Sequence, residues 1–369
     1  MYHTFESLQE MHVEVTSRCN AACPMCARNN FGGSEKDGLV LSDWSAQDAE
    51  KVFDVRFKNL RNVLLCGTHG DPAVNPNSLE IVQTVRKNAP NATVEFYSNG
   101  SLRTPQWWSE LGRVLRKKNE DGYYRRTDLC IFSVDGLGDT NHLYRRKTNF
   151  EKIMANAEAF IKSGGIARWD YIVFKHNEHQ VEEAEALAKK MGFKQFRIRK
   201  TSRFAYSPDG PMKHRVLNSN NEIEYFLEPT SRSEFLNKEK ETYEKIVSKE
   251  KQETYSYESQ VKCLNKTQFQ RIYINAQVKV MPCCFVGNDF YPGSGLVFRD
   301  TKAKVGLKYG EEFNSLKEKT WDEILNHDWY AKDLVASWNQ ADTRLVRCQR
   351  TCGAQCNPIT SQSQDVQFA

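Results

Sequence analysis

The stretch Cys19–Cys26, with the sequence CNAACPMC, decides the fold of this chain, because its three cysteines are separated by three and then by two residues. Three such thiolates can hold three irons of a 4Fe-4S cluster, whereas clusters of this type usually take four cysteines. One iron then stays open to a small molecule that binds through an amine and a carboxylate. A zinc site that borrows His12 is an alternative. A disulfide needs an oxidising compartment, for which the sequence gives no sign.

Length and composition limit the possible classes of protein. The 369 residues suffice for a domain of about 200 residues and a second, smaller one. No apolar run approaches the ~20 residues needed to cross a bilayer, and the first ten residues lack the pattern of a signal peptide. The net charge of +5 is mild, and no nucleic-acid-binding signature accompanies the basic run 113–118. We therefore expect a cytoplasmic protein without a membrane or nucleic-acid partner.

The eleven cysteines are grouped rather than scattered. Three lie in the opening motif, six lie beyond Lys262, and Cys66 and Cys130 stand alone in apolar segments. Free cysteine is among the most buried residue types, so these two are expected in the core. In a reducing compartment, grouped cysteines indicate metal sites more often than disulfides.

Apolar segments of strand length alternate with helical periodicity over the first 200 residues. Segments rich in Val, Ile, Phe and Tyr are predicted as strands at 11–16, 62–66, 93–98, 128–134, 169–174 and 195–199. Residues 149–162 and 179–191 carry apolar side chains at three- and four-residue intervals and are predicted as helices. Strands that alternate with helices form parallel βα units. The pattern predicts an α/β fold, an open partial (β/α)6 barrel with ligands at the carboxyl ends of its strands.

A distinctive motif follows each of the first four predicted strands. The cysteine stretch follows the first, Gly67-Thr68-His69-Gly70-Asp71-Pro72 the second, and Tyr97-Ser98-Asn99-Gly100 the third. The fourth ends in Ser133-Val134-Asp135-Gly136, and Arg145 lies shortly beyond it. Each motif alone is weak, because Asn-Gly and Asp-Gly are ordinary turn signals. Their order after successive strands is the specific feature.

On these motifs, residues 10–200 resemble the radical S-adenosylmethionine (radical SAM) superfamily. The resemblance implies that Cys19, Cys23 and Cys26 hold a 4Fe-4S cluster whose open iron binds SAM. It implies that the glycine-rich segment holds the SAM ammonium group and that an arginine pairs with the SAM carboxylate. The implied cofactor-binding residues are Met25, Gly70, Asp71, Ser98, Asn99, Ser133 and Arg145. The sequence departs from the family where His69 replaces a glycine, Asp71 a glutamate and Met25 an aromatic residue.

The composition changes past Arg199. Residues 202–261 are strongly hydrophilic and are expected to be a linker or insertion, and disorder is an alternative for 206–221. A hairpin is predicted from 268–274 and 278–281, with Cys263 before it and Cys283 and Cys284 after it. The sequence therefore suggests three parts: a barrel over 1–201, the linker or insertion over 202–261, and a small α+β cysteine-rich domain over 262–369.

The late cysteines, which end with Cys348, Cys352 and Cys356, resemble those of the auxiliary-cluster domains called twitch and SPASM. The resemblance implies one auxiliary 4Fe-4S cluster. Its ligands would be Cys263, one of Cys283 and Cys284, and two of the last three cysteines. Four thiolates suit zinc equally well, so spacing alone does not decide the metal.

The two resemblances together imply an enzyme of the oxidoreductase or peptide-modifying type. It would cleave SAM reductively to a 5'-deoxyadenosyl radical that takes a hydrogen atom from a substrate, while the auxiliary cluster assists net oxidation or bond formation. An electron donor such as flavodoxin or ferredoxin is implied. Peptide or protein modification is expected. A dehydrogenase or epimerase of a small molecule, and a non-catalytic protein stapled by zinc or a cluster, are the alternatives. No catalytic side chain is singled out.

Overall fold

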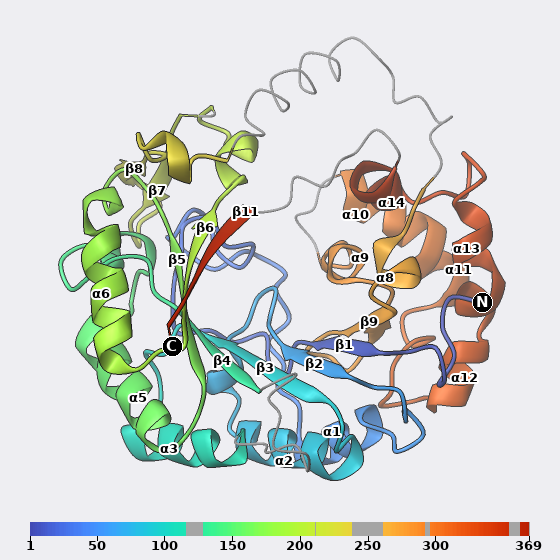
Figure 1. Cartoon of the computed structure of the whole chain (residues 1–369). Helices are drawn as coiled ribbons and strands as arrows, with labels where there is room; N and C mark the ends of the chain where they lie inside the picture. The colour runs from blue at the N-terminus through green and yellow to red at the C-terminus, as the bar shows by residue number, and fades with distance from the viewer. Residues whose placement is uncertain (116–127, 211, 238–260, 292–295, 354–361, 369) are drawn as a thin grey trace. The chain divides into compact units, whose positions relative to one another are not determined.

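The computed structural model describes residues 1–115, 128–210, 212–237, 261–291, 296–353 and 362–368 (Figure 1). The chain divides into two compact units. The first unit combines residues 1–18 and 37–95 with residues 256–358. The second combines residues 19–36 and 96–255 with residues 359–369. Each unit therefore draws on both early and late parts of the chain.

The sheet of the first unit has β1 (Glu10–Val13) at its centre. Its strands follow the order β10-β9-β1-β2, where β2 is Asn62–Leu65, β9 is Arg271–Ile274 and β10 is Val280–Met281. β1 pairs in parallel with both neighbours, and Met11 lies opposite Val63 on one side and Ile272 on the other. β9 and β10 are antiparallel, as expected for the predicted hairpin. The parallel pairing of this hairpin with β1 was not foreseen from the sequence.

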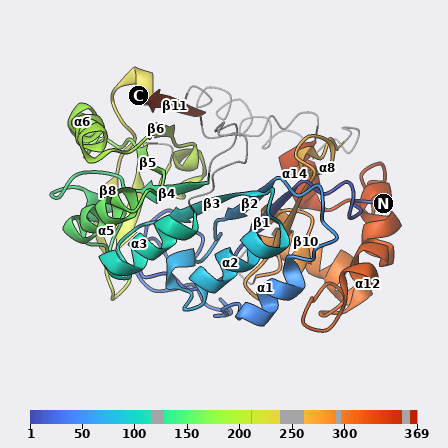
Figure 2. The same ribbon diagram turned by 60° about the horizontal axis from the view of Figure 1, so that its bottom comes forward.

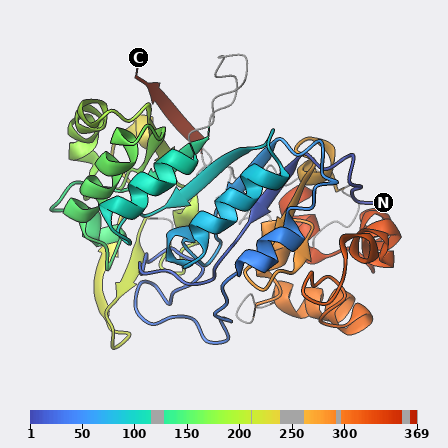
Figure 3. The same cartoon turned by 90° about the horizontal axis from the view of Figure 1, so that it is seen from below.

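Short helices complete the first unit. Those of its early part are α1 (Ala46–Val52), the 3-10 turn η1 (Pro72–Val74) and α2 (Ser78–Asn88), and Figure 3 shows α1 and α2 against the strands. The late part contributes α8 (Leu264–Thr267), α9 (Cys284–Asn288), α10 (Leu296–Thr301), the π-helical turn η5 (Lys302–Gly306), α11 (Leu307–Tyr309), α12 (Trp321–Asn326), the π-helical turn η6 (Trp329–Asp333), α13 (Leu334–Ser337) and α14 (Val346–Cys352).

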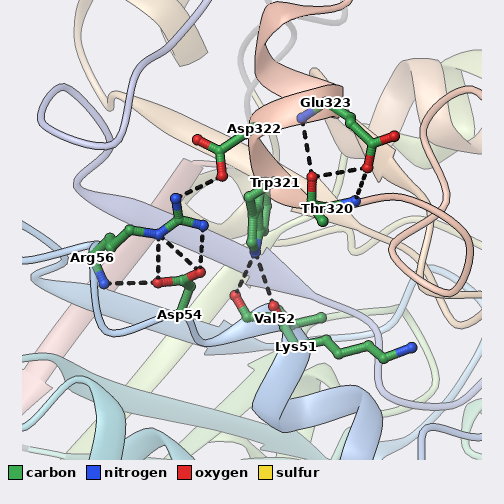
Figure 4. Close-up of polar contacts among 8 residues, drawn as sticks. All are labelled: Lys51, Val52, Asp54, Arg56, Thr320, Trp321, Asp322 and Glu323. Carbon is green, nitrogen blue, oxygen red and sulfur yellow. Dashed lines mark hydrogen bonds and ion pairs between the residues drawn. The ribbon is translucent and has the colours of Figure 1, made fainter.

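Contacts between α12 and the end of α1 join the early and late parts of this unit (Figure 4). The buried Trp321 donates its indole N–H to the carbonyls of Lys51 and Val52 at 3.0 and 3.1 Å. Arg56 donates to Asp322 at 2.6 Å, on the exposed side of the same contact. The late helices are therefore part of the same packed unit as α1.

The second unit holds β4 (Leu129–Ser133), β5 (Ala167–Ile172), β6 (Gln195–Lys200) and β11 (Gln362–Gln367), in that order. β4, β5 and β6 are parallel, and β11 is antiparallel to β6. β3 (Thr93–Ser98) spans the boundary between the two units. All six strands expected from the apolar segments are present, each shifted by at most a few residues. The predicted α/β fold class is confirmed.

Helices lie along one side of the strands of this unit (Figures 1 and 2). They include α3 (Pro105–Val114), α4 (Asn141–Tyr144), α5 (Phe150–Lys162), the 3-10 turn η2 (Glu178–Gln180) and α6 (Val181–Met191). Asn149 caps α5 by accepting the Lys152 N–H, and Gly192 ends α6 in the left-handed conformation, with φ of 90°. Both predicted helices are therefore present.

The segment expected as a linker carries regular structure where it is described. It begins with the 3-10 turn η3 (Arg203–Tyr206) and continues as a hairpin of β7 (His214–Leu217) and β8 (Ile223–Leu227). A further 3-10 turn, η4 (Ser233–Phe235), follows. Val216 and Leu227 of the hairpin are buried, so its inner face packs as part of the second unit. Among the described residues, no helix has the length and apolar character needed to span a membrane.

Candidate cluster and cofactor site

The cysteine stretch belongs to the second unit and packs on a common apolar centre. Cys23 is buried, and Cys19 and Cys26 are half-buried. All three, together with Met25, pack against a buried group that includes Ala21, Tyr144, Phe174, Phe204, Val216 and Leu227. The stretch turns tightly, because the Cys26 N–H donates to the Cys23 carbonyl at 3.0 Å. The structure therefore brings the three proposed ligands and Met25 to one place.

An ion pair lies next to the Cys23 sulfur. Arg145 donates from Nε to Asp135 Oδ2 at 2.6 Å, and its Nη1 lies 3.8 Å from the Cys23 sulfur. The Asp135 side chain is fully buried, and it also accepts the Ile172 N–H at 2.5 Å. Burial raises the pKa of the Cys23 thiol to about 11, and Arg145 opposes this shift. A buried thiol of this kind becomes a thiolate when a metal replaces its proton.

The polar residues that follow β3 face the same stretch. Asn99 donates from Nδ2 to Asn20 Oδ1 at 2.9 Å, and the same nitrogen lies 3.9 Å from the Cys19 sulfur. Asn99 also accepts the Ser101 N–H, and Ser98 accepts the Gly100 N–H at 3.0 Å. These bonds fix the turn after β3. Ser133 is the last residue of β4 and is half-buried, so it too lies at the carboxyl end of a strand.

The glycine-rich segment belongs to the first unit. A Cβ at Gly70 would lie 1.8 Å from the Thr16 carbonyl oxygen, so only glycine fits at this position. Asp71 caps η1, because its side chain accepts the Ala73 N–H at 3.0 Å. The side chain of Asp71 therefore stabilises the loop to which it belongs.

Glu14 lies beneath this segment, and the sequence analysis did not identify it. Its Oε1 accepts the N–H groups of His69 and Gly70 at 2.6 and 3.0 Å, and its other oxygen accepts the Tyr273 hydroxyl. Burial raises the pKa of Glu14, but interactions with His69 and Tyr273 outweigh burial and hold the pKa below its usual value. A buried ionised carboxylate therefore orients the loop. A single Glu at the end of an apolar strand is the signal that could have found it.

His69 replaces a family glycine and occupies a specific position next to this carboxylate. It is 5% exposed, its Nδ1 lies 3.9 Å from Glu14 Oε2, and its ring packs on Tyr291. Within the described residues, the buried Nδ1 of His69 has no hydrogen-bond partner.

Main-chain and tyrosine contacts link several of the late cysteines in the first unit. The Lys262 N–H donates to the Cys352 carbonyl at 2.8 Å, which brings Cys263 beside the end of α14. The Tyr2 hydroxyl lies 3.8 Å from the Cys263 sulfur and donates to the carbonyl of Pro282, the residue before Cys283, at 2.8 Å. Burial raises the pKa of Cys283 and that of Cys348, the latter to about 12. Cys263, Cys283, Cys348 and Cys352 are therefore one candidate ligand set.

The adjacent Cys283 and Cys284 differ in their local structure. Cys283 is the N-cap of α9 and accepts the Val286 N–H at 3.4 Å, whereas Cys284 begins the helix. Burial raises the pKa of Cys284, and the two neighbouring cysteines interact electrostatically with each other. Both therefore remain candidate ligands. Cys356 lies outside the described residues.

The residue types at both cysteine groups fit a 4Fe-4S cluster, in which each cysteine binds a different iron. Four thiolates also suit a structural zinc ion, so the ligand chemistry alone fits either group. Within the described part of the chain, no three His, Cys, Asp or Glu side chains are arranged to hold one metal ion.

One known family matches just under half of the chain. Residues 13–191 match the family described as the radical SAM superfamily. This match confirms the predicted radical SAM domain. The family implies an enzyme that uses a 4Fe-4S cluster and SAM. The matched range of the radical SAM domain contains Cys19, Cys23 and Cys26, the glycine-rich segment and Arg145.

Two curated proteins are similar to part of the chain. The tungsten-containing aldehyde ferredoxin oxidoreductase cofactor-modifying protein of Pyrococcus furiosus is 29% identical over 133 residues, which are 35% of this chain and 32% of that protein. The FeMo cofactor biosynthesis protein NifB of Methanocaldococcus jannaschii is 26% identical over 101 residues, 26% of this chain and 34% of that protein. The chain thus matches about a third of the length of each relative.

Solved structures share the fold over most of the chain. SuiB of Streptococcus suis, solved with its precursor peptide SuiA, has a TM-score of 0.51 and 12% identity, and the alignment covers 88% of this chain and 66% of SuiB. The protein anSMEcpe, solved with bound AdoMet, has a TM-score of 0.52 and 12% identity, with coverage of 96% and 87%. At this identity the likeness concerns the fold alone.

Proposed function

We propose that this protein is a radical SAM enzyme whose cluster is held by Cys19, Cys23 and Cys26, with SAM bound at the open iron. The observation that carries the proposal is the gathering of these three cysteines on one apolar centre, beside Arg145 and Asn99. When bound, the cluster and SAM supply a 5'-deoxyadenosyl radical that takes a hydrogen atom from the substrate. The electron comes from a donor such as flavodoxin or ferredoxin.

The protein's own residues hold and shield this site. Cys23 is 8% exposed and Asn99 is 5% exposed, so the Cys23 thiol is largely protected from water, whereas Cys19 and Cys26 are half-buried. Exclusion of water protects reactive intermediates from side reactions. Asn99 holds the start of the stretch through Asn20. Arg145 offers a cationic group beside Cys23 for the SAM carboxylate, although its Nε is already held by Asp135.

We further propose one auxiliary 4Fe-4S cluster on Cys263, Cys283, Cys348 and Cys352. Its support is geometric: the Lys262 N–H donates to the Cys352 carbonyl, and the Tyr2 hydroxyl links the Cys263 sulfur to the carbonyl of Pro282, the residue before Cys283. Cys348 and Cys352 lie one turn apart on α14. These four cysteines would hold the cluster, which would supply an electron acceptor for net oxidation or bond formation. A shared fold with SuiB, which was solved with a precursor peptide, supports peptide or protein modification.

A small-molecule substrate is the second candidate. The curated relatives are named for the modification or biosynthesis of cofactors rather than of peptides. A dehydrogenase or epimerase of a small molecule would use the same radical chemistry. The two candidates are separated by incubating the protein and SAM with peptides and with small-molecule fractions, and recording which fraction yields a SAM-dependent mass change.

Metal analysis after anaerobic reconstitution tests the cluster proposals. If the protein holds two 4Fe-4S clusters, we expect about eight irons per chain. If its cysteines bind structural zinc instead, we expect zinc and no iron. Cys23→Ala should lose SAM cleavage and about four irons, while Cys283→Ala should lose about four irons and Cys284→Ala none. SAM cleavage by Cys23→Ala at the parental rate would contradict the assignment of the first cluster. Equal iron loss in the Cys283 and Cys284 variants would contradict that of the second.

A further inference from the structure

One arginine joins three segments of the second unit around the cysteine stretch. Arg203 begins η3, directly after β6. Its Nη1 donates to the Met25 carbonyl at 3.3 Å and to the Tyr144 hydroxyl at 3.0 Å. Tyr144 ends α4 and is itself buried in the apolar centre that the cysteines contact. A single guanidinium therefore ties the residue that precedes Cys26 to α4 and to the carboxyl end of β6.

The charge of Arg203 differs from that of the neighbouring arginines. Arg145 is paired with Asp135 at 2.6 Å, and Arg199 is paired with Asp170 at 3.3 Å. Within the described residues, no carboxylate lies at ion-pair distance from Arg203, and its two hydrogen-bond acceptors are formally neutral. Burial raises the pKa of Tyr144 to about 12, so this phenol is neutral at ordinary pH. Arg203 is an exposed residue, and its positive charge at the Met25 carbonyl, one residue before Cys26, has no compensating acid among the described residues.

The Arg203 guanidinium donates to the Met25 carbonyl, so its charge lies at the residue that precedes the proposed ligand Cys26. A cation near a sulfur ligand favours the form of the site that carries more negative charge. Reduction of an iron-sulfur cluster adds one negative charge, and nearby charge is one of the factors that set its potential.

We propose that Arg203 is a positioning residue that anchors the cysteine stretch and raises the reduction potential of the cluster held there. The inference rests on the proposed function. The anchor is the bond to the Met25 carbonyl, and the effect on potential comes from the uncompensated charge beside Cys26. An easier reduction would let a moderate electron donor load the cluster.

The test compares Arg203→Gln, Arg203→Lys and the control Arg232→Gln in the full-length, anaerobically reconstituted protein. Arg232 lies in the same unit, but it is paired with Glu182 and Glu234. The potential is read from the reduced-cluster EPR signal that Cys23→Ala abolishes. Arg203→Gln should shift the reduction equilibrium toward the oxidised form by at least threefold, about 28 mV at 59 mV per tenfold for one electron. Arg203→Lys should restore more than half of the shift, and Arg232→Gln should cause none.

Hydrogen exchange of peptides that cover residues 19–26 provides a second readout. Exchange should be faster in Arg203→Gln than in the parent and unchanged in Arg232→Gln. If Arg203→Gln keeps its full iron content and its reduction potential is unchanged, the proposed effect of Arg203 on the potential is wrong. If hydrogen exchange at residues 19–26 is unchanged, the proposed anchoring role is wrong, even where the variant binds no iron. A parent protein without the Cys23-dependent signal would instead refute the proposed function.

Discussion

Arg145→Met removes one partner of a buried ion pair, and its cost can be worked out from the structure. Arg145 donates to Asp135 at 2.6 Å, and the Asp135 side chain is 0% exposed. Without the guanidinium, the carboxylate keeps the Ile172 N–H as a donor but loses its cationic partner. Breaking a buried pair by removing one partner costs about 3–5 kcal/mol. We therefore expect a loss of that size in the free energy of unfolding of this unit.

A double-mutant cycle separates the pair from its surroundings. Asp135→Asn combined with Arg145→Met leaves no unpaired charge, so the double variant should recover much of the loss, with a coupling energy of about 2–3 kcal/mol. Arg146→Met is the matched control. Arg146 pairs with Glu224 at 2.8 Å, but that glutamate side chain is 45% exposed, so its loss should cost less than about 1 kcal/mol.

The assay is urea unfolding of the reconstituted protein followed by tryptophan fluorescence, with SAM affinity measured in parallel. Equal destabilisation by the Arg145 and Arg146 variants would refute the argument from burial. The SAM measurement tests the second role of Arg145. If the double variant regains stability but not SAM affinity, the guanidinium binds SAM as well as Asp135. If it regains both, Arg145 acts on the fold alone.

The glycine-rich segment offers further tests. Gly70→Ala should lower the free energy of unfolding by about 1–3 kcal/mol and weaken SAM binding, because the new Cβ would lie 1.8 Å from the Thr16 carbonyl oxygen. The control Gly306→Ala, whose new Cβ would have its nearest neighbour 3.7 Å away, should leave urea unfolding unchanged. Asp71→Ala should cost about 1 kcal/mol as a lost cap, whereas Asp71→Asn should retain SAM affinity, and failure of this rescue would show that the charge is needed. The lowered pKa of Glu14 means that its stabilising effect is present above its unfolded pKa of about 4.5 and is lost as the pH falls through the folded pKa. Glu14→Gln should therefore be less stable than the parent at pH 7, with the gap closing below pH ~4.5; a gap that does not change with pH would contradict this assignment.

Much of the fold could be predicted because its signals are local. The strands are short apolar runs, and the helices at 150–162 and 181–191 have clear periodicity and end signals. The cysteine stretch was found from spacing, and its position after β1 follows from the chain order. Such features depend on residues a few positions apart, so the sequence displays them directly.

The rest depends on contacts between distant residues. The parallel pairing of β1 with β9 joins Met11 to Ile272, and no local pattern announces it. The same holds for β11 beside β6, which places residues 362–367 in the second unit. The proposed choice of Cys283 as a ligand depends on how the start of α9 folds, which spacing does not show. The link between Glu14 and the loop at 67–72 likewise appears only when β1 and β2 lie side by side.

The pairing of β1 with β9 also affects how the chain is made. During synthesis on a ribosome, β1 emerges long before residues 271–274, so one of its edges has no native neighbour until most of the polypeptide has been translated. An unpaired strand edge invites association with other chains, and such late, non-local pairings are slow to form. We therefore expect ribosome-bound fragments that end before residue 271 to aggregate more than the released protein.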